Sequence, residues 1–362
     1  MKVPSTRRRA LQAAGVWFAA SPLANPQDGP KLKGEPPGHI APLEDLVNVF
    51  EMESMARQCL PARDFGAIAG GDDRNAFDRI TFRPRMLFDV TELDLTLDLF
   101  GARMYAPVLI GPASDQRRFH RDGEIATVRG AAAAQAAMVI SDRSSQPVEK
   151  IAAEAKSTPL WYQIYPETDM GPVLERMQRA ISARCLAICI SIGAPYQHDP
   201  ASSLKLAPVA SPRVDWPAID RVRRAAQKPV LIKGIMSPAE ARAAVQHGVD
   251  GIIVSAPAAR VVHGIASPIE MLPAVVDAVA GAIPVLADGG FRRGTDVLAA
   301  LALGARAVLV TRPVLWGLTA YGAEGVQTVM EMLQSETARD MALCGKRNLA
   351  AIDRTLVKVH LR

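Results

Sequence analysis

Short apolar runs alternate with longer Ala-rich, charge-bearing segments through most of the chain. The apolar runs cover residues 107–111, 137–140, 160–164, 185–192, 229–233, 251–254, 283–287 and 307–310. Continuous apolar runs of this length predict buried strands, and most of the segments between them have a helical period. Eight strands alternating with helices predict an α/β fold, a (β/α)8 barrel. An open doubly wound sheet is the alternative, but the first strand lacks a Gly-x-Gly-x-x-Gly turn.

The region before the first predicted strand divides into three parts. Residues 1–24 contain Lys2 and Arg7–Arg9, then the apolar run Ala13–Ala20, then small residues up to Ala24. This order is typical of a signal peptide, and the run is too short to remain as a membrane span in the mature chain. Residues 25–41 are rich in Pro, Gly and Lys and predict a linker. Helical patterning begins near residue 42, so we expect the barrel domain, with an N-terminal helical segment, at 42–355.

The signal sequence also suggests a route and a location. Thr6–Gln12 resembles a twin-arginine signal, although Ala10 stands where a large apolar residue is usual. That route exports folded proteins, which suits a chain that takes up a cofactor first. We therefore expect a periplasmic protein. A cytoplasmic protein with a disordered basic N-terminus is the alternative.

The charge of the mature chain is close to zero. The formal net charge is +5, but without the four basic residues of the first 24 the chain has 38 basic and 37 acidic residues. This balance gives no reason to expect nucleic-acid binding. The four cysteines do not have the spacing of a metal site and are too few to predict a disulfide framework, so we expect no metal.

Polar residues recur at the ends of the predicted strands. They are Ser141, Gln163 with Tyr165, Ser191, Lys233, Ser255, Asp288 and Arg312. Ligands of a barrel bind at the C-terminal ends of its strands. One polar residue in such a place has many explanations, but this recurrence predicts a ligand site.

A phosphate site is predicted between residues 283 and 313. One apolar run ends in Asp288-Gly289-Gly290 and the next ends in Thr311-Arg312, with a helical segment between them. Glycines let the backbone approach a ligand closely, and Arg292 and Arg312 would supply positive charge. An ordinary strand-helix-strand unit with solvated arginines is the alternative.

The chain resembles the FMN-dependent 2-hydroxy-acid oxidases and dehydrogenases, the family that includes glycolate oxidase and lactate oxidase. The likeness covers about residues 42–355. It rests on the stretches 82–87, 112–116, 123–124, 161–165 and 233–235, and above all on the block from Asp288 to Ala305. The resemblance implies a (β/α)8 barrel, FMN as cofactor, a small 2-hydroxy acid or related carboxylate as substrate, and a homo-oligomer.

The resemblance implies that most of the flavin site is present. Backbone at Pro112, Ala113 and Ser114 would face the flavin ring, and Ser141, Gln163, Ser191, Lys233 and Ser255 would lie around it. Asp288 would bind the ribityl chain, and Gly289, Gly290, Arg292, Thr311 and Arg312 would hold the phosphate. Lys233 would place a cation where negative charge gathers on reduced flavin. Thr311 replaces a glycine of the family.

The catalytic site departs from the family pattern. The family motif Ser-Asn-His-Gly-Gly-Arg appears as residues 255–260, so Pro257 stands in place of the histidine that acts as general base. Proline has no titratable group and cannot take a proton. Gly193 replaces the aspartate that supports the histidine, and Ala67 replaces a tyrosine. Tyr165, Lys233 and Arg260 remain as catalytic candidates, while the arginine expected just after Pro195 has no clear counterpart.

Three functions remain open from the sequence. The first is an FMN oxidoreductase that takes a hydride from a small 2-hydroxy acid, with weak turnover because the base is lost. The second is an exported FMN-binding scaffold or partner protein without catalysis. The third is an FMN enzyme with altered chemistry that uses Lys233, Tyr165 or His198. The fold alone does not separate these functions.

Overall fold

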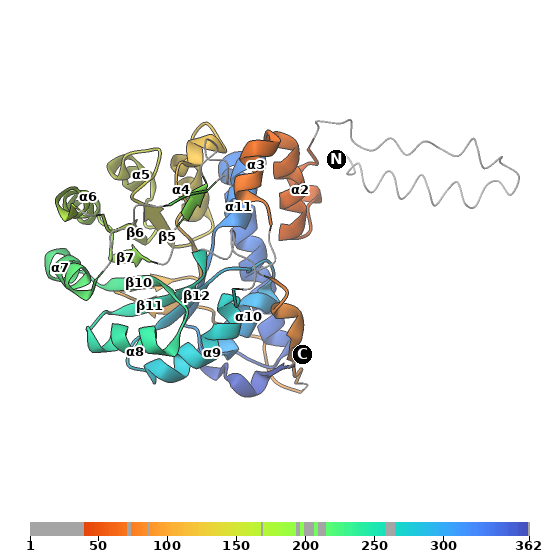
Figure 1. Cartoon of the computed structure of the whole chain (residues 1–362). Helices are drawn as coiled ribbons and strands as arrows, with labels where there is room; N and C mark the ends of the chain where they lie inside the picture. The colour runs from red at the N-terminus through yellow and green to blue at the C-terminus, as the bar shows by residue number, and fades with distance from the viewer. Residues whose placement is uncertain are drawn as a thin grey trace, which may run out of the picture.

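Eight parallel strands close into a barrel (Figure 1). The computed structural model describes residues 40–70, 74–85, 87–167, 169–192, 215–257 and 265–360, and the backbone alone of 196–198 and 206–208. The barrel strands are β4 (Val108–Ile110), β5 (Met138–Ser141), β6 (Leu160–Ile164), β7 (Ala187–Ser191), β10 (Val230–Ile235), β11 (Gly251–Ser255), β12 (Val285–Asp288) and β13 (Ala307–Val310). Because β13 pairs with β4, no barrel strand has a free edge. The predicted (β/α)8 barrel is confirmed.

A helix follows each barrel strand and packs outside it. These helices are α4 (Glu124–Ala133), α5 (Val148–Glu154), α6 (Met170–Ser182), α7 (Trp216–Ala226), α8 (Pro238–Gln246), α9 (Pro268–Val279), α10 (Gly294–Ala302) and α11 (Arg312–Leu343). Ser237 shows how the sequence starts such a helix, since it forms a capping box with Glu240 and precedes a proline at the first turn of α8. Gly322 interrupts α11 with a φ of 60°, so this long element is two helices joined at a kink.

Side chains alternate between two apolar layers along each strand. Leu109, Val139, Trp161, Cys189, Leu231, Ile253, Leu286 and Leu309 fill the interior of the barrel. The residues between them, such as Val108, Ile140 and Tyr162, pack in the layer between strands and helices. Alternation with a period of two places every second residue on one face of a strand. Within one strand, residues two apart therefore enter the same layer.

A hairpin closes the N-terminal end of the barrel. It consists of β2 (Leu97–Leu99) and β3 (Ala102–Met104), joined by Phe100 and Gly101, which both have positive φ as in the tight turns that favour hairpins. The Phe100 ring meets the Trp161 ring edge-on, with 5.4 Å between their centroids. A Cβ atom at Gly251 would lie 2.9 Å from Phe100 Cζ, so only glycine leaves room for this ring. The opposite end, where the strands terminate, is left for the site.

The N-terminal segment packs along the last helix (Figure 1). The predicted helical pattern at 42–70 appears as η1 (Leu43–Asp45), α2 (Val49–Cys59) and α3 (Ala62–Ile68), and α2 and α3 lie against α11. Trp316 Nε1 donates a hydrogen bond of 2.7 Å to the Ile68 carbonyl. After η3 (Phe77–Arg79), β1 (Ile80–Phe82) pairs with the C-terminal β14 (Val357–Val359). The remaining short elements are η4 (Gln116–Arg118), β8 (Tyr196–His198), β9 (Leu206–Pro208), η6 (Leu349–Ala351) and η7 (Arg354–Leu356).

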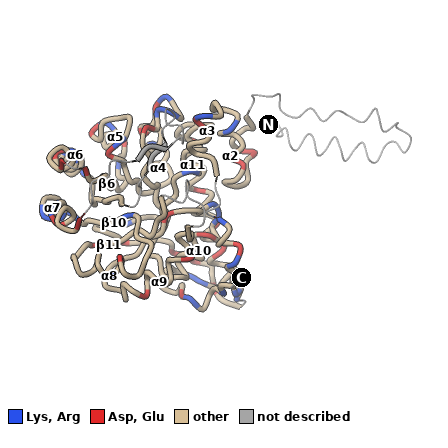
Figure 2. The backbone as a smooth tube through the Cα atoms, in the orientation of Figure 1, with Lys and Arg blue, Asp and Glu red and all other residues tan. Residues whose placement is uncertain are grey.

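Charged residues are mixed over the surface. Figure 2 shows basic and acidic positions interspersed along the outer helices rather than gathered on one side. None of the helices within the described ranges is long and apolar enough to cross a bilayer. Residues 1–39, which include the predicted signal and nearly all of the linker, lie outside the described part, so those two assignments stay predictions.

Candidate functional site

The polar residues singled out in the sequence form the layer directly above the apolar interior. Ser141, Gln163, Ser191, Lys233, Ser255, Asp288 and Thr311 each lie two positions beyond an interior residue of their strand. Strand register sets Ser141 opposite Gln163, Ser191 opposite Lys233, and Ser255 opposite Asp288. These residues therefore meet at the C-terminal end of the barrel, where barrel proteins bind their ligands.

A buried lysine in this layer is held by two neighbours. Lys233 Nζ lies 2.5 Å from Asp288 Oδ2 and donates a hydrogen bond of 2.8 Å to Ser255 Oγ. Ser255 Oγ in turn donates to Asp288 Oδ2 at 3.0 Å. A buried ammonium group is stable only when it is paired and hydrogen-bonded, and this triangle meets both conditions. The result is a cation fixed in position at the end of β10.

The side-chain amide of Gln163 is buried without a hydrogen-bond partner among the described residues. It is fully buried, and neither its Oε1 nor its Nε2 has a hydrogen-bond partner in the described structure. Buried polar atoms are nearly always bonded, because an unsatisfied one costs about 1–3 kcal/mol. A flat group that offers both a donor and an acceptor along one edge would satisfy the amide. Nearby, Ser114 Oγ in the loop after β4 lies 3.3 Å from Ser141 Oγ at the end of β5.

The loop after β12 has the form of an anion cradle. Gly289 and Gly290 have φ values of 129° and 83°, which glycine adopts readily and other residues rarely do. Arg292 follows, with its guanidinium stacked 4.8 Å from the centre of the Trp316 ring and donating to the Phe291 carbonyl. The close backbone approach that the two glycines allow and the stacked cation both favour a phosphate at this point.

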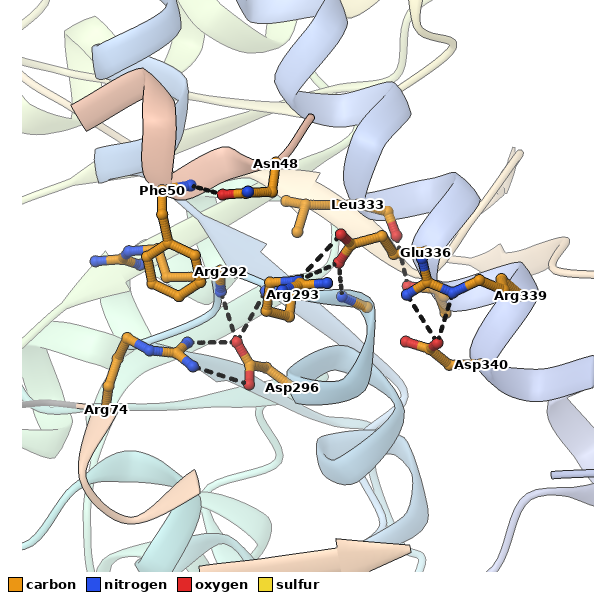
Figure 3. A network of polar contacts seen from close by, with 12 residues as sticks. Asn48, Phe50, Arg74, Arg292, Arg293, Asp296, Leu333, Glu336, Arg339 and Asp340 are labelled. Carbon is orange, nitrogen blue, oxygen red and sulfur yellow. Dashed lines mark hydrogen bonds and ion pairs between the residues drawn. The ribbon is translucent and has the colours of Figure 1, made fainter. Parts of the chain in front are cut away.

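Asp296 holds that loop in place (Figure 3). Its Oδ2 accepts hydrogen bonds from the backbone N–H of Arg292 at 2.8 Å and of Arg293 at 2.9 Å. Arg74 pairs with the same carboxylate and also donates to the Gly290 carbonyl at 2.8 Å. Glu336 of α11 secures the next turn through Arg293 and the Gly294 N–H. The cradle is thus preorganised by a network that reaches from the N-terminal segment to the last helix.

The predicted phosphate residues after β13 lie at the start of α11. Thr311 is the N-cap residue of this helix and Arg312 its first residue. Arg312 Nη1 makes a 3.4 Å contact with the Ala69 carbonyl just beyond α3. Ala67 belongs to α3, so this contact sets Ala67 close to the start of α11.

Only some of the catalytic candidates belong to the described residues. Tyr165 follows β6 and is half-buried, and its N–H donates to Asp142 Oδ2 at 3.2 Å. Pro257 lies just after β11, half-buried, and offers no group that exchanges a proton. Arg260, Gly193 and the side chain of His198 lie outside the described residues.

The histidines of the described part are all engaged elsewhere. His120 accepts from the Asp122 N–H and packs against Gly322 at the kink of α11. His247 stacks on Trp216 with ring centroids 4.2 Å apart, and His360 bonds Thr81. No contact in the described structure joins any of these three side chains to the residues around Lys233, so none is held there as a replacement base.

Asp142 is a further acid close to the candidates, and it faces away from them. Its side chain is 1 % exposed and lies 3.5 Å from Arg176 of α6, in the layer between strands and helices. Burial raises the pKa of this carboxyl above its ordinary value. Because Ser141 points into the site, the alternation along β5 sends Asp142 outward, where it cannot serve as the base.

The sequence reasoning passed over Arg143, which lies two positions beyond Ser141. Its guanidinium carbon is 4.3 Å from the centre of the Tyr165 ring. Residues two apart along a strand face the same side, and extending this alternation two residues past the end of β5 would have included Arg143.

Comparison with known proteins agrees with this geometry. The model of the FMN-dependent dehydrogenase family matches residues 65–207 and 197–359. Human 2-hydroxyacid oxidase 1 is 33 % identical over 360 residues, covering 87 % of this chain and 97 % of that protein. Spinach glycolate oxidase is 35 % identical over 352 residues, covering 86 % and 95 %. A crystal structure of mandelate oxidase with (S)-2-phenylpropionate superimposes with a TM-score of 0.80 at 36 % identity, covering 88 % of this chain and all of that one.

The residues present fit the flavin that this family carries. The unsatisfied amide of Gln163 would meet the polar edge of a flavin ring, and the fixed Lys233 would face the same edge. The positive-φ glycines and stacked Arg292 would receive the phosphate of FMN. Fold, site layer and whole-chain similarity lead to one conclusion: the chain belongs to the FMN-dependent dehydrogenase family, whose members include the 2-hydroxy-acid oxidases.

Proposed function

We propose that this protein is an FMN-dependent oxidoreductase of small 2-hydroxy acids whose turnover of the common substrates is weak or altered. The observation that carries the proposal is a contrast within one layer of residues. The cofactor positions hold polar groups suited to flavin, whereas Pro257 holds the position of the general base. Cofactor binding and proton transfer depend on different residues, so one can be lost while the other persists.

The proposed roles follow from where each side chain lies. Bound FMN would supply the acceptor for the hydride of the substrate. Gln163 and Ser141 would orient the ring through hydrogen bonds, and Lys233 would supply positive charge along its polar edge. Asp288 would fix Lys233 and face the ribityl chain. Tyr165 would hydrogen-bond the hydroxyl or keto oxygen of the substrate, and Arg260 would pair with its carboxylate.

The missing base sets the expected rate. A positioned general base typically contributes about 10²–10⁴ to the rate, and its loss together with the supporting acid costs at least that much. Turnover of lactate, glycolate or mandelate is therefore expected to be very slow or absent. A different substrate that needs no such base, or one served by Tyr165, Lys233 or His198, would give altered chemistry.

A second function, an FMN-binding protein without catalysis, has specific support. Pro257, Gly193 and Ala67 together replace a base, its supporting acid and a tyrosine of the family pattern. Loss of several cooperating groups is the expected outcome once selection for their reaction ends, while a bound flavin can keep its structural value.

An absorption experiment separates the two functions. The purified mature chain is examined for a flavin spectrum and then mixed anaerobically with a panel of 2-hydroxy acids. Bleaching by one acid supports the oxidoreductase and names its substrate class. A flavin spectrum that stays oxidised with every acid supports the non-catalytic protein, and absence of flavin contradicts both.

We also propose that the chain is exported to the periplasm through its twin-arginine-type signal and works as a homo-oligomer. The basic head, the apolar run and the small residues up to Ala24 support the export proposal. Fractionation of cells with the two arginines Arg7 and Arg8 intact or changed to lysine tests the route. Retention of both forms in the cytoplasm would favour the cytoplasmic alternative. Light scattering of the purified chain tests the assembly.

A further inference from the structure

Arg143 lies at the mouth of the site with its backbone held on both sides. Its N–H donates to Ser141 Oγ at 3.2 Å, and its carbonyl accepts from the Asp115 N–H at 3.0 Å. The first contact joins it to the site layer, and the second joins it to the loop after β4. Its position over the C-terminal end of the barrel is therefore defined by the backbone and not only by its own rotamer.

The side chain of Arg143 is directed onto the next strand end. Its guanidinium carbon lies 4.3 Å from the centre of the Tyr165 ring, a distance at which a cation and an aromatic face attract each other. Stacking of this kind leaves the edge of the guanidinium, with its N–H donors, free to bind a second group. Tyr165 thus serves as a platform that holds the guanidinium of Arg143 near the end of β6.

No acid forms an ion pair with this arginine within the described part of the chain. The guanidinium of Arg143 has no ion pair or side-chain hydrogen bond there, and the residue is exposed. The adjacent Asp142 pairs instead with Arg176 in the outer layer. Lys233 is the contrasting case, because Asp288 already compensates its charge. Arg143 therefore adds positive charge on the side of the site from which a ligand enters.

We propose that Arg143 binds the carboxylate of the ligand, with its orientation set by stacking on Tyr165. This inference rests on the proposed function, because it names a second residue, in addition to Arg260, that recognises the acid group of the substrate. A guanidinium edge matches a carboxylate with two parallel hydrogen bonds, and an exposed position lets it exchange ligand quickly. The ligand class is then a small carboxylic acid rather than a neutral alcohol or an amine.

The test uses the flavin-loaded chain and oxalate, a dicarboxylate that cannot be oxidised as a 2-hydroxy acid. Calorimetric titration is carried out on the wild type, Arg143→Leu, Arg143→Lys and the control Arg121→Leu. The Arg121 side chain is 89 % exposed and pairs with Asp122. Loss of a charged hydrogen-bond donor is expected to weaken oxalate binding about tenfold or more in Arg143→Leu. The oxalate affinity of Arg143→Lys is expected to lie between those of the wild type and Arg143→Leu. That of Arg121→Leu is expected to match the wild type. Lactamide, which has no carboxylate, is expected to perturb the flavin spectrum equally in all four proteins.

Each contrary outcome has its own meaning. Equal oxalate affinity in wild type and Arg143→Leu overturns the role of Arg143 and leaves the proposed function standing. An equal loss of oxalate and lactamide binding, or loss of flavin from Arg143→Leu, assigns the residue a structural role and also overturns the inference. A flavin-loaded wild type that binds no carboxylate overturns the proposed function, and the inference with it.

Discussion

The hydroxyl of Thr311 lies beside Gly111, where β13 meets β4. A Cβ atom at Gly111 would be 2.2 Å from Thr311 Oγ1, which is far inside the contact distance of the two atoms. The threonine that replaces a glycine of the family is thus accommodated by a glycine on the neighbouring strand. Its side chain lies against that strand end, while its backbone caps α11.

Gly111→Ala is expected to destabilise the protein and reduce its flavin content. Inserting a methyl group into a packed site typically costs about 1–3 kcal/mol, and here the collision would displace the start of α11. The double variant Gly111→Ala/Thr311→Gly is expected to recover most of the flavin, since the colliding hydroxyl is gone. Gly66→Ala, with nothing within 4 Å of the added atom, is the control and is expected to leave flavin content unchanged. Flavin absorbance per protein and thermal melting measure both effects.

Asp288→Ala is expected to cost about 3–5 kcal/mol of unfolding free energy, because it leaves Lys233 buried with its charge unpaired. Removing both charges in Lys233→Met/Asp288→Ala is expected to cost less than the sum of the single changes. Denaturant unfolding of the four proteins gives the coupling energy. Strict additivity would mean that the 2.5 Å contact contributes nothing to the folded state.

Asp142 is expected to make stability depend on pH. Burial raises the pKa of this carboxyl in the folded protein above its usual value near 3.8, so the folded state holds the proton more tightly than the unfolded chain does. The unfolding free energy of the wild type relative to Asp142→Asn should therefore fall as the pH rises from about 4 through the raised pKa, and then level off. A difference that does not vary with pH would contradict this assignment. Unchanged flavin reduction rates in Asp142→Asn would agree with its outward position.

Pro257→His alone is not expected to restore rapid oxidation of 2-hydroxy acids. A histidine needs an acid to fix its tautomer and stabilise its protonated form, and Gly193 supplies none. Pro257→His/Gly193→Asp is expected to reduce the flavin at least about tenfold faster than the single variant, on the scale of general-base catalysis. Anaerobic stopped-flow with glycolate, lactate and mandelate measures both rates. Strong rescue by the single change would show that another group orients the new imidazole.

The sequence predicted the barrel and much of the site layer because both depend on a simple period. In a closed parallel barrel, residues two apart along a strand face the same side, so polar residues such as Gln163 and Asp288 just past apolar runs had to meet at one end. The predicted strand limits fall within a few residues of the observed ones, from 107–111 against β4 to 307–310 against β13.

Features that depend on how strands are staggered were not predictable in this way. Lys233 and Asp288 belong to strands separated by β11, and their contact follows from the tilt and register of three strands together. The contact of Phe100 with Trp161 joins the turn between β2 and β3 to a barrel strand about sixty residues further along the chain, and no local pattern in the sequence indicates it. Arg143 was missed because it lies two residues beyond the end of β5, outside the apolar run that marked the strand in the sequence.

The hairpin that carries Phe100 closes one end of the barrel. Since Phe100 and the apolar interior fill that end, a substrate and its product must use the same passage in opposite directions. A product that keeps the carboxylate of its substrate must therefore leave past the same residues that receive the next substrate. Any molecule that settles over the strand ends would stop entry and release together.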